Sequence, residues 1–186
     1  MPFETLPFET LLLSSCLLPG RTDFKESNAS VEVTPLPGET ILFFNIDDQS
    51  NPGCKLRQFL WGTETGQKMC DLMVFYAKGN SERVIGFVEL KHNIGHLGHA
   101  TKQVINTYNN LKRHLQKSYT SYTPKAFISA CGGSSPREHE EYQRELSKEF
   151  GKNNFDVNNN RSNDALGDLL RGIPPKTGQG KRKNKK

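Results

Sequence analysis

Two mostly apolar runs, residues 71–76 and 84–91, lie on either side of a short Lys-Gly-Asn-Ser segment. Successive side chains of a strand point to opposite faces of a sheet, so a run that is apolar at nearly every position fits a strand covered on both faces. The polar segment between the two runs favours an antiparallel hairpin. The pattern therefore predicts two central strands paired with each other.

Other segments have the character of neighbouring strands. Residues 41–46 and 126–130 are short apolar runs bounded by turn-forming residues, and residues 155–157 are a shorter candidate inside an Asn-rich region. The segment 55–61 is ambiguous, with a strand as its first candidate.

Two longer helices are expected after the hairpin. Beyond Gly98, apolar side chains recur at the spacing of one helix face, at Ala100, Val104, Tyr108, Leu111 and Leu115. For the second helix, Ser135 is a capping residue, Pro136 suits the first helical position and Glu138 completes a capping box. Gly151 is placed to end that helix.

The segments near the two ends carry weaker patterns. An apolar stretch over 11–18, closed by Pro19 and Gly20, predicts a first helix, and 163–171 predicts a short last one. Strands and helices in this order predict an α/β fold, with a mixed sheet flanked by helices. We expect one domain over residues 1–160, followed by a basic, disordered tail over 161–186.

The positive charge of the chain is concentrated in that tail. The 186 residues carry a formal net charge of +5, whereas the chain before residue 176 is nearly neutral. Three interpretations of the tail stay open: salt-dependent attraction to phosphates, a solubilising end, or a nuclear-localisation cluster if the source is eukaryotic.

Composition excludes some classes of protein. The longest apolar run, Leu11 to Leu13, is far shorter than the ~20 residues of a membrane span, so no membrane partner is expected. The four cysteines include no CxxC pair, which argues against a zinc site or a disulfide framework. Glu4 and Glu9, without Lys or Arg beside them, are unlike a secretion signal. The expected location is cytoplasmic, or nuclear if the source is eukaryotic.

Three charged residues lie where the central hairpin should be buried. Glu89 and Lys91 are two residues apart, so both project from one face of the second strand. Asp71 begins the antiparallel neighbour and can lie beside Glu89. Two converging carboxylates repel each other unless a cation lies between them, and hard oxygen ligands select Mg²⁺ or Mn²⁺.

An Asp followed across a hairpin by Glu-x-Lys resembles the PD-(D/E)xK, or restriction-endonuclease-like, nuclease superfamily. The stretches that carry the resemblance are residues 70–75 and 87–91. It implies a restriction-endonuclease-like mixed β-sheet flanked by helices, with the core spanning roughly residues 5–131. It also implies a metal-dependent nuclease.

The resemblance implies a role for each residue of the motif. Asp71 and Glu89, with the backbone carbonyl of Leu90 or Val88, would hold Mg²⁺ (or Mn²⁺). Lys91 would orient the attacking water or stabilise charge on the phosphorane.

The next helix also contributes to the resemblance. Gln103 is the polar residue that many members of the superfamily place facing the site, where it would position Lys91 or the nucleophile. An acid from the first helix, used by some members, has only Glu9 and Glu39 as candidates. A second Asp-x-Lys match, at residues 23–25, has no recognisable strand around it.

Alternatives remain at the level of site and function. His92, His96 and His99 would share one face of a continuous helix and suit zinc, but Gly95 and Gly98 interrupt them, which favours histidines that face solvent or phosphate. Basic residues that could contact phosphates are Lys55, Arg57, Lys68, Lys102, Lys112 and Arg113.

The expected function is a metal-dependent endonuclease acting on nucleic acid, with DNA preferred over RNA. A homodimer or a partner subunit would suit such an enzyme. The alternative is a non-catalytic nuclease-like subunit that binds nucleic acid or a partner.

Overall fold

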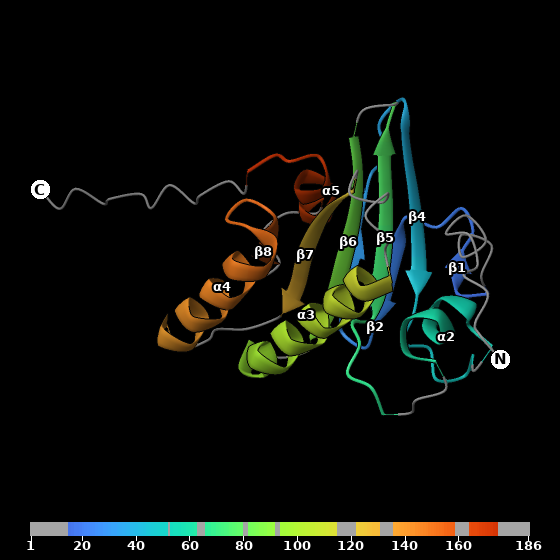
Figure 1. The fold of residues 1–186 in the computed structure, drawn as a ribbon. Coiled ribbons are helices and arrows are strands. Elements are labelled where there is room, and N and C mark those ends of the chain that lie inside the picture. The colour runs from blue at the N-terminus through green and yellow to red at the C-terminus, as the bar shows by residue number, and fades with distance from the viewer. Residues whose placement is uncertain are drawn as a thin grey trace, which may run out of the picture.

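The computed structural model describes residues 15–51, 53–62, 66–79, 82–91, 94–114, 122–130, 136–158 and 164–174. These residues form an α/β unit around a six-stranded mixed sheet (Figure 1). In their order across the sheet, the strands are β1 (Leu17–Leu18), β4 (Glu39–Asn45), β5 (Leu72–Lys78), β6 (Glu82–Lys91), β7 (Thr123–Ala130) and β8 (Phe155–Asn158).

The central hairpin predicted from the sequence is confirmed. β5 pairs antiparallel with β4 on one side and with β6 on the other. β7 runs parallel to β6, and β8 runs parallel to β7. These two parallel pairs are connected by α3 (Leu97–His114), which follows the short 3₁₀ helix η1 (Ile94–His96), and by α4 (Pro136–Phe150).

Each face of the sheet is covered by different elements. The helices α3 and α4 pack side by side over one face, where they enclose Met73, Phe87 and Ile128 (Figure 1). The other face is covered by α5 (Ala165–Leu170) and a separate hairpin of β2 (Asp23–Glu26) and β3 (Ala29–Glu32). Leu72 and Val88 belong to this second core. The alternation along β5 and β6 therefore supplies two cores at once.

The predicted helices and outer strands after the hairpin are also confirmed. Along α3, Ala100, Val104 and Leu111 are buried as the spacing required, whereas Leu115 lies outside the described residues. α4 ends at Gly151, which has φ 89° and donates its N–H to Ser147 O at 3.0 Å.

Residues 55–61 form α2 (Lys55–Trp61), and the expectation of a strand there was wrong. Leu56 and Leu60 are one helical turn apart and both are buried. Cys54 precedes the helix, and its Sγ accepts a hydrogen bond from the backbone N–H of Arg57 at 3.4 Å. A helix of two turns has too few residues for its periodicity to be distinct from that of a strand.

The N-terminal part differs from its prediction. Residues 11–14 lie outside the described residues, and Leu17 and Leu18 form the edge strand β1 rather than the end of a helix. The second Asp-x-Lys match does lie on a strand, β2. There Asp23 is exposed and pairs with Arg21 at 2.9 Å, so this match is a surface feature.

The folded unit continues to residue 174, past the boundary expected at 160. Leu166, Leu169 and Leu170 of α5 are buried in the second core. Lys125 on β7 donates from Nζ to the carbonyl oxygens of Leu169 and Leu170, at 2.7 and 3.2 Å. Gly86 on β6 leaves room for this helix, because a Cβ there would lie 3.3 Å from Leu170 Cδ2.

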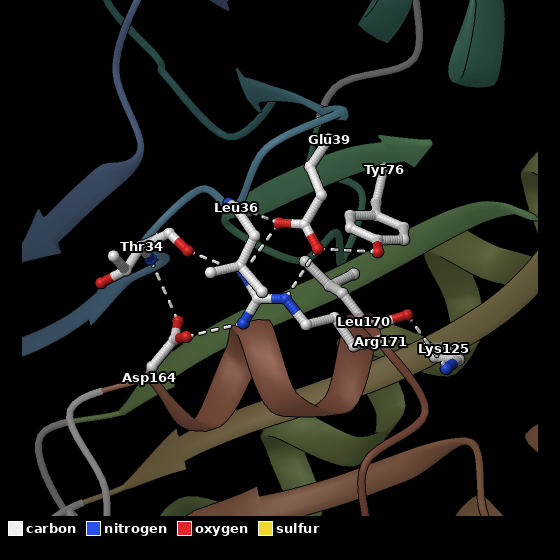
Figure 2. A network of polar contacts seen from close by, with 8 residues as sticks. All are labelled: Thr34, Leu36, Glu39, Tyr76, Lys125, Asp164, Leu170 and Arg171. Atoms are coloured by element: carbon white, nitrogen blue, oxygen red, sulfur yellow. Dashed lines mark hydrogen bonds and ion pairs between the residues drawn. The ribbon is translucent and has the colours of Figure 1, made fainter. Parts of the chain in front are cut away.

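Charged side chains also attach α5 to the sheet (Figure 2). Arg171 binds Glu39 at the start of β4 and, through Nη1, the carboxylate of Asp164 at 2.7 Å. Asp164 in turn accepts the backbone N–H of Thr34 at 3.1 Å. This network lies at the end of β4 opposite to Asn45, which pairs with Leu72.

Candidate active site

The three residues of the predicted motif meet at the end of the central hairpin. Asp71 directly precedes β5, and Glu89 and Lys91 lie at the end of β6. The pairing of Leu72 with Val88 places Asp71 opposite Glu89, on the face of the sheet that α3 covers. The side-by-side position expected for these residues is therefore present.

Hydrogen bonds hold the two carboxylates in place. Glu89 is fully buried and Asp71 is 3% exposed. Asp71 donates its backbone N–H to Glu89 Oε2 at 3.2 Å, and Asp71 Oδ2 accepts the backbone N–H of Leu90 at 2.7 Å. Lys91 Nζ forms an ion pair with Glu89 Oε1, and the Lys91 side chain keeps 19% of its exposure. The lysine thus connects the buried pair to solvent.

The site places two buried carboxyl groups beside one lysine. Burial raises the pKa of Asp71 well above its usual range, and the Glu89 carboxylate raises it further. Burial also raises the pKa of Glu89, although Lys91 opposes the shift. Burial alone would lower the pKa of Lys91, but its hydrogen bond to Glu89 and the nearby carboxylates outweigh that effect, so its pKa is raised. Ionised together, these groups leave a buried excess of negative charge.

A hard divalent cation suits this donor set. Mg²⁺ commonly binds through one or two carboxylates and keeps several waters or substrate oxygens as its remaining ligands. Asp71 and Glu89 offer such a pair, and the carbonyl of Leu90 is the backbone ligand predicted beside them. Within the described ranges, no group of three or more His, Cys, Asp or Glu side chains is arranged to hold a metal ion. A cation here would therefore depend on the two carboxylates together with oxygens that are not side chains.

Gln103 contacts the segment that leads into the site. Its Nε2 donates to the carbonyl of Met69 at 2.7 Å, two residues before Asp71. Its buried Oε1 finds no partner among the described residues. One turn later, Thr107 Oγ1 accepts the backbone N–H of Cys70 at 2.9 Å. The geometry gives Gln103 and Thr107 the role of holding the backbone before Asp71 against α3, while a contact of Gln103 with Lys91 stays a prediction.

Two acidic residues near the site were missed from the sequence. Asp47 is half-buried just after β4, and its pKa is raised by burial first and then by Glu26, while the charge of Lys91 opposes the shift. Glu26, exposed at the end of β2, also raises the pKa of Asp71. Asp47 had a usable signal, since it follows a predicted strand that neighbours the one beginning at Asp71. Glu26 had none, because only the tertiary fold brings β2 to this end of the sheet.

Other candidate residues lie elsewhere. Glu39, proposed as an additional acid, lies at the opposite end of β4 bound to Arg171, so that expectation was wrong; Glu9 lies outside the described residues. Arg57 donates to the carbonyl of Ile46 at 2.8 Å and holds the chain after β4 rather than facing a phosphate.

The zinc alternative receives no support from the histidines that the structure describes. His96 and His99 are both exposed, and His92 lies outside the described residues. The aromatic ring of His114 packs against that of Phe59, with 4.8 Å between the ring centroids.

Comparison of the chain with protein-family models, with curated proteins and with solved structures gave no match. Within the described residues, no helix is both long and apolar enough to cross a membrane. A function for this chain therefore has to be argued from the geometry and charge of the site.

Proposed function

We propose that the chain is a metal-dependent nuclease that hydrolyses phosphodiester bonds, with DNA as the preferred substrate. The observation that carries the proposal is the convergence of Asp71, Glu89 and Lys91 at the end of a buried hairpin. Burying charged groups at a strand end costs free energy, and ionisable groups buried in this way cluster at functional sites. Metal-assisted phosphoryl chemistry uses each of them.

The topology agrees with the restriction-endonuclease-like arrangement that the motif implies. Three antiparallel strands, β4 to β6, are followed by α3 and by β7, which is parallel to β6. Asp71 directly precedes the second of these strands, and Glu89 and Lys91 lie at the end of the third. We propose this fold relationship on the order and direction of the elements together with the position of the charged residues.

The proposed mechanism assigns a role to each side chain. A divalent cation held by Asp71 and Glu89 would polarise the scissile phosphate and lower the pKa of an attacking water. Lys91, charged and partly exposed, would hydrogen-bond that water or the phosphorane oxygens as their charge develops. Water adds to phosphorus, one ester P–O bond breaks, and the leaving oxygen takes up a proton. Gln103 would keep Asp71 in position through Met69.

Cleavage of supercoiled plasmid, single-stranded DNA and RNA by the purified protein tests the proposal. We expect cutting with Mg²⁺ or Mn²⁺, none with EDTA, and a loss of about 10²-fold or more in Lys91→Ala. Lys148→Ala is the matched control, because Lys148 is exposed on α4 and its substitution should leave the rate unchanged.

Two outcomes would contradict the nuclease. Cutting that is undiminished in Lys91→Ala would point to a contaminating enzyme. Absence of cutting on every substrate, with both metals and with folded protein, would favour a nuclease-like subunit that only binds nucleic acid or a partner.

A further inference from the structure

The outer side of α3 carries basic residues that begin next to the site. His99, Lys102 and Arg113 are exposed, and they are spaced by three and then eleven residues, close to one and three helical turns. They therefore lie along one side of the helix. From His99 to Arg113 this side is about 21 Å long at the rise of an α-helix.

Lys68 joins this side of α3 from the segment before Asp71. Asn106 Nδ2 donates to the carbonyl of Lys68 at 2.6 Å, and Gln103 Nε2 donates to the carbonyl of the following residue, Met69, at 2.7 Å. Asn106 and Gln103 lie on the same side of the helix as His99 and Lys102. The hydrogen bonds therefore fix the exposed Lys68 beside them. We call Lys68, His99, Lys102 and Arg113 the basic stripe.

The pKa of His99 responds both to the site lysine, Lys91, and to Lys68 and Lys102 of the basic stripe. Burial lowers the pKa of His99, and the positive charge of Lys91 lowers it further. Lys68, His96 and Lys102 act on His99 in the same direction. His99 therefore lies close enough to Lys91 and to the lysines of the basic stripe to feel the charge of each, so the stripe begins beside the site.

No acid of α3 balances these charges. The 18 residues of α3 contain no Asp or Glu, whereas the sequence of α4 beside it has an excess of acid, with five Glu against Arg137, Arg144 and Lys148. Among the described residues, the ion pairs do not involve any member of the stripe. The acidic residues near the site, Glu26 and Asp47, come from the other elements. A phosphate chain leaving the site therefore meets attraction along α3 and repulsion along α4.

We infer that the basic stripe binds the phosphate backbone of a polynucleotide that runs from the site along α3. The inference rests on the proposed function for the position of the reacting phosphate. It specifies a substrate several nucleotides long, held without regard to base sequence, because charged side chains on phosphates carry no base readout.

Binding in EDTA tests the inference apart from cleavage. Fluorescence anisotropy would follow a labelled single strand long enough to span α3, its duplex and the matching RNA. We expect Lys102→Gln to weaken binding roughly threefold and to reduce the slope of log K against log salt by about 0.7–0.9. The triple variant Lys68→Gln/Lys102→Gln/Arg113→Gln should lose roughly thirtyfold in affinity, because three independent losses of about threefold multiply.

The matched control is Lys148→Gln, which removes the same charge from an exposed position of α4. It should bind as the unsubstituted chain does. The C-terminal basic tail is identical in every variant, so differences among them report on the helices. Equal loss in Lys102→Gln and Lys148→Gln, or full binding by the triple variant, would overturn the inference. Displacement of the oligonucleotide by polyglutamate at equal charge concentration would also overturn it, in favour of an acidic protein partner.

Kinetics separates this inference from the proposed function. If the protein cuts, the triple variant should raise KM for the polynucleotide and leave hydrolysis of bis(p-nitrophenyl) phosphate unchanged, since that small diester cannot reach the stripe. If the triple variant hydrolysed both the polynucleotide and the small diester more slowly, the three residues would be needed for folding or for the chemical step, and the inference would be overturned. Loss of binding in the triple variant of a chain that cuts nothing would support the stripe and contradict the nuclease.

Discussion

Arg171 holds both carboxylate oxygens of Glu39 across 132 residues of chain, from Nε to Oε1 at 2.8 Å and from Nη2 to Oε2 at 2.9 Å. The Glu39 side chain is fully buried, and it also accepts Tyr76 Oη at 3.0 Å and the backbone N–H of Leu36 at 2.9 Å. The pair attaches α5 to the sheet at the end remote from the candidate site. Stability and the proposed chemistry are therefore carried by separate groups of charges.

Replacing Arg171 should destabilise the protein strongly. Arg171→Met leaves the Glu39 carboxylate buried and unpaired, which costs about 3–5 kcal/mol in the free energy of unfolding. Arg171→Lys should recover only part of this, because an ammonium group cannot make the two parallel hydrogen bonds of a guanidinium. Urea denaturation measures the loss.

The surface pair of Arg21 and Asp23 provides the comparison. Their side chains are 52% and 60% exposed, so Arg21→Met should cost less than about 1 kcal/mol. Similar losses in Arg21→Met and Arg171→Met would show that the buried network is not a principal attachment of α5.

The same pair predicts a loss of stability in acid. The hydrogen bond from Arg171 lowers the pKa of Glu39 from 4.5 to about 2. A carboxyl group whose pKa is lower in the folded state stabilises the fold above its unfolded pKa, and this contribution is lost as the pH falls from 4.5 towards 2. It amounts to about 3 kcal/mol at neutral pH. Unfolding measured across this pH range should show a smaller drop in Glu39→Gln than in the unsubstituted chain; parallel curves would contradict the assignment.

The parts of the fold predictable from sequence are those set by local periodicity. The hairpin of β5 and β6 is apolar on both faces because both faces are covered, and that pattern is visible in the chain itself. The face of α3 with Ala100 and Val104 was predictable for the same reason. In contrast, α2 is too short for its period to be decisive, and the exposed strand β2 has few apolar residues to pattern.

The candidate site divides in the same way. Asp71, Glu89 and Lys91 could be brought together from strand alternation and hairpin pairing alone. Glu26 could not, because its position depends on how the β2–β3 hairpin packs on the sheet. Gln103 was placed on the correct helix, but its hydrogen bond to the carbonyl of Met69 depends on the path of the irregular segment before Asp71, which no periodicity describes.

The buried carboxylates should reduce stability in the metal-free protein. Asp71→Asn keeps an oxygen able to accept the N–H of Leu90 and removes the free-energy cost of burying a carboxyl group whose pKa burial and Glu89 raise to about 9. In EDTA near neutral pH, we expect a gain of about 1 kcal/mol and a melting temperature higher by about 2–4 °C. Glu32→Gln, at an exposed position of β3, should change stability by less than about 0.5 kcal/mol. A destabilised Asp71→Asn would show that the carboxylate is satisfied without a cation.

Divalent cations should make the unsubstituted protein more stable than Asp71→Asn, the reverse of the order expected in EDTA. If Asp71 and Glu89 hold Mg²⁺ or Mn²⁺, binding stabilises the folded chain by about 2.7 kcal/mol when the free metal is about 100 times its Kd. Differential scanning fluorimetry with increasing Mn²⁺ should therefore raise the melting temperature of the unsubstituted protein, while Asp71→Asn should respond weakly because one of the two carboxylate ligands is lost. Glu32→Gln should respond as the unsubstituted chain does. Equal responses in all three proteins would place the metal elsewhere, and the two buried carboxylates would then have to be explained without one.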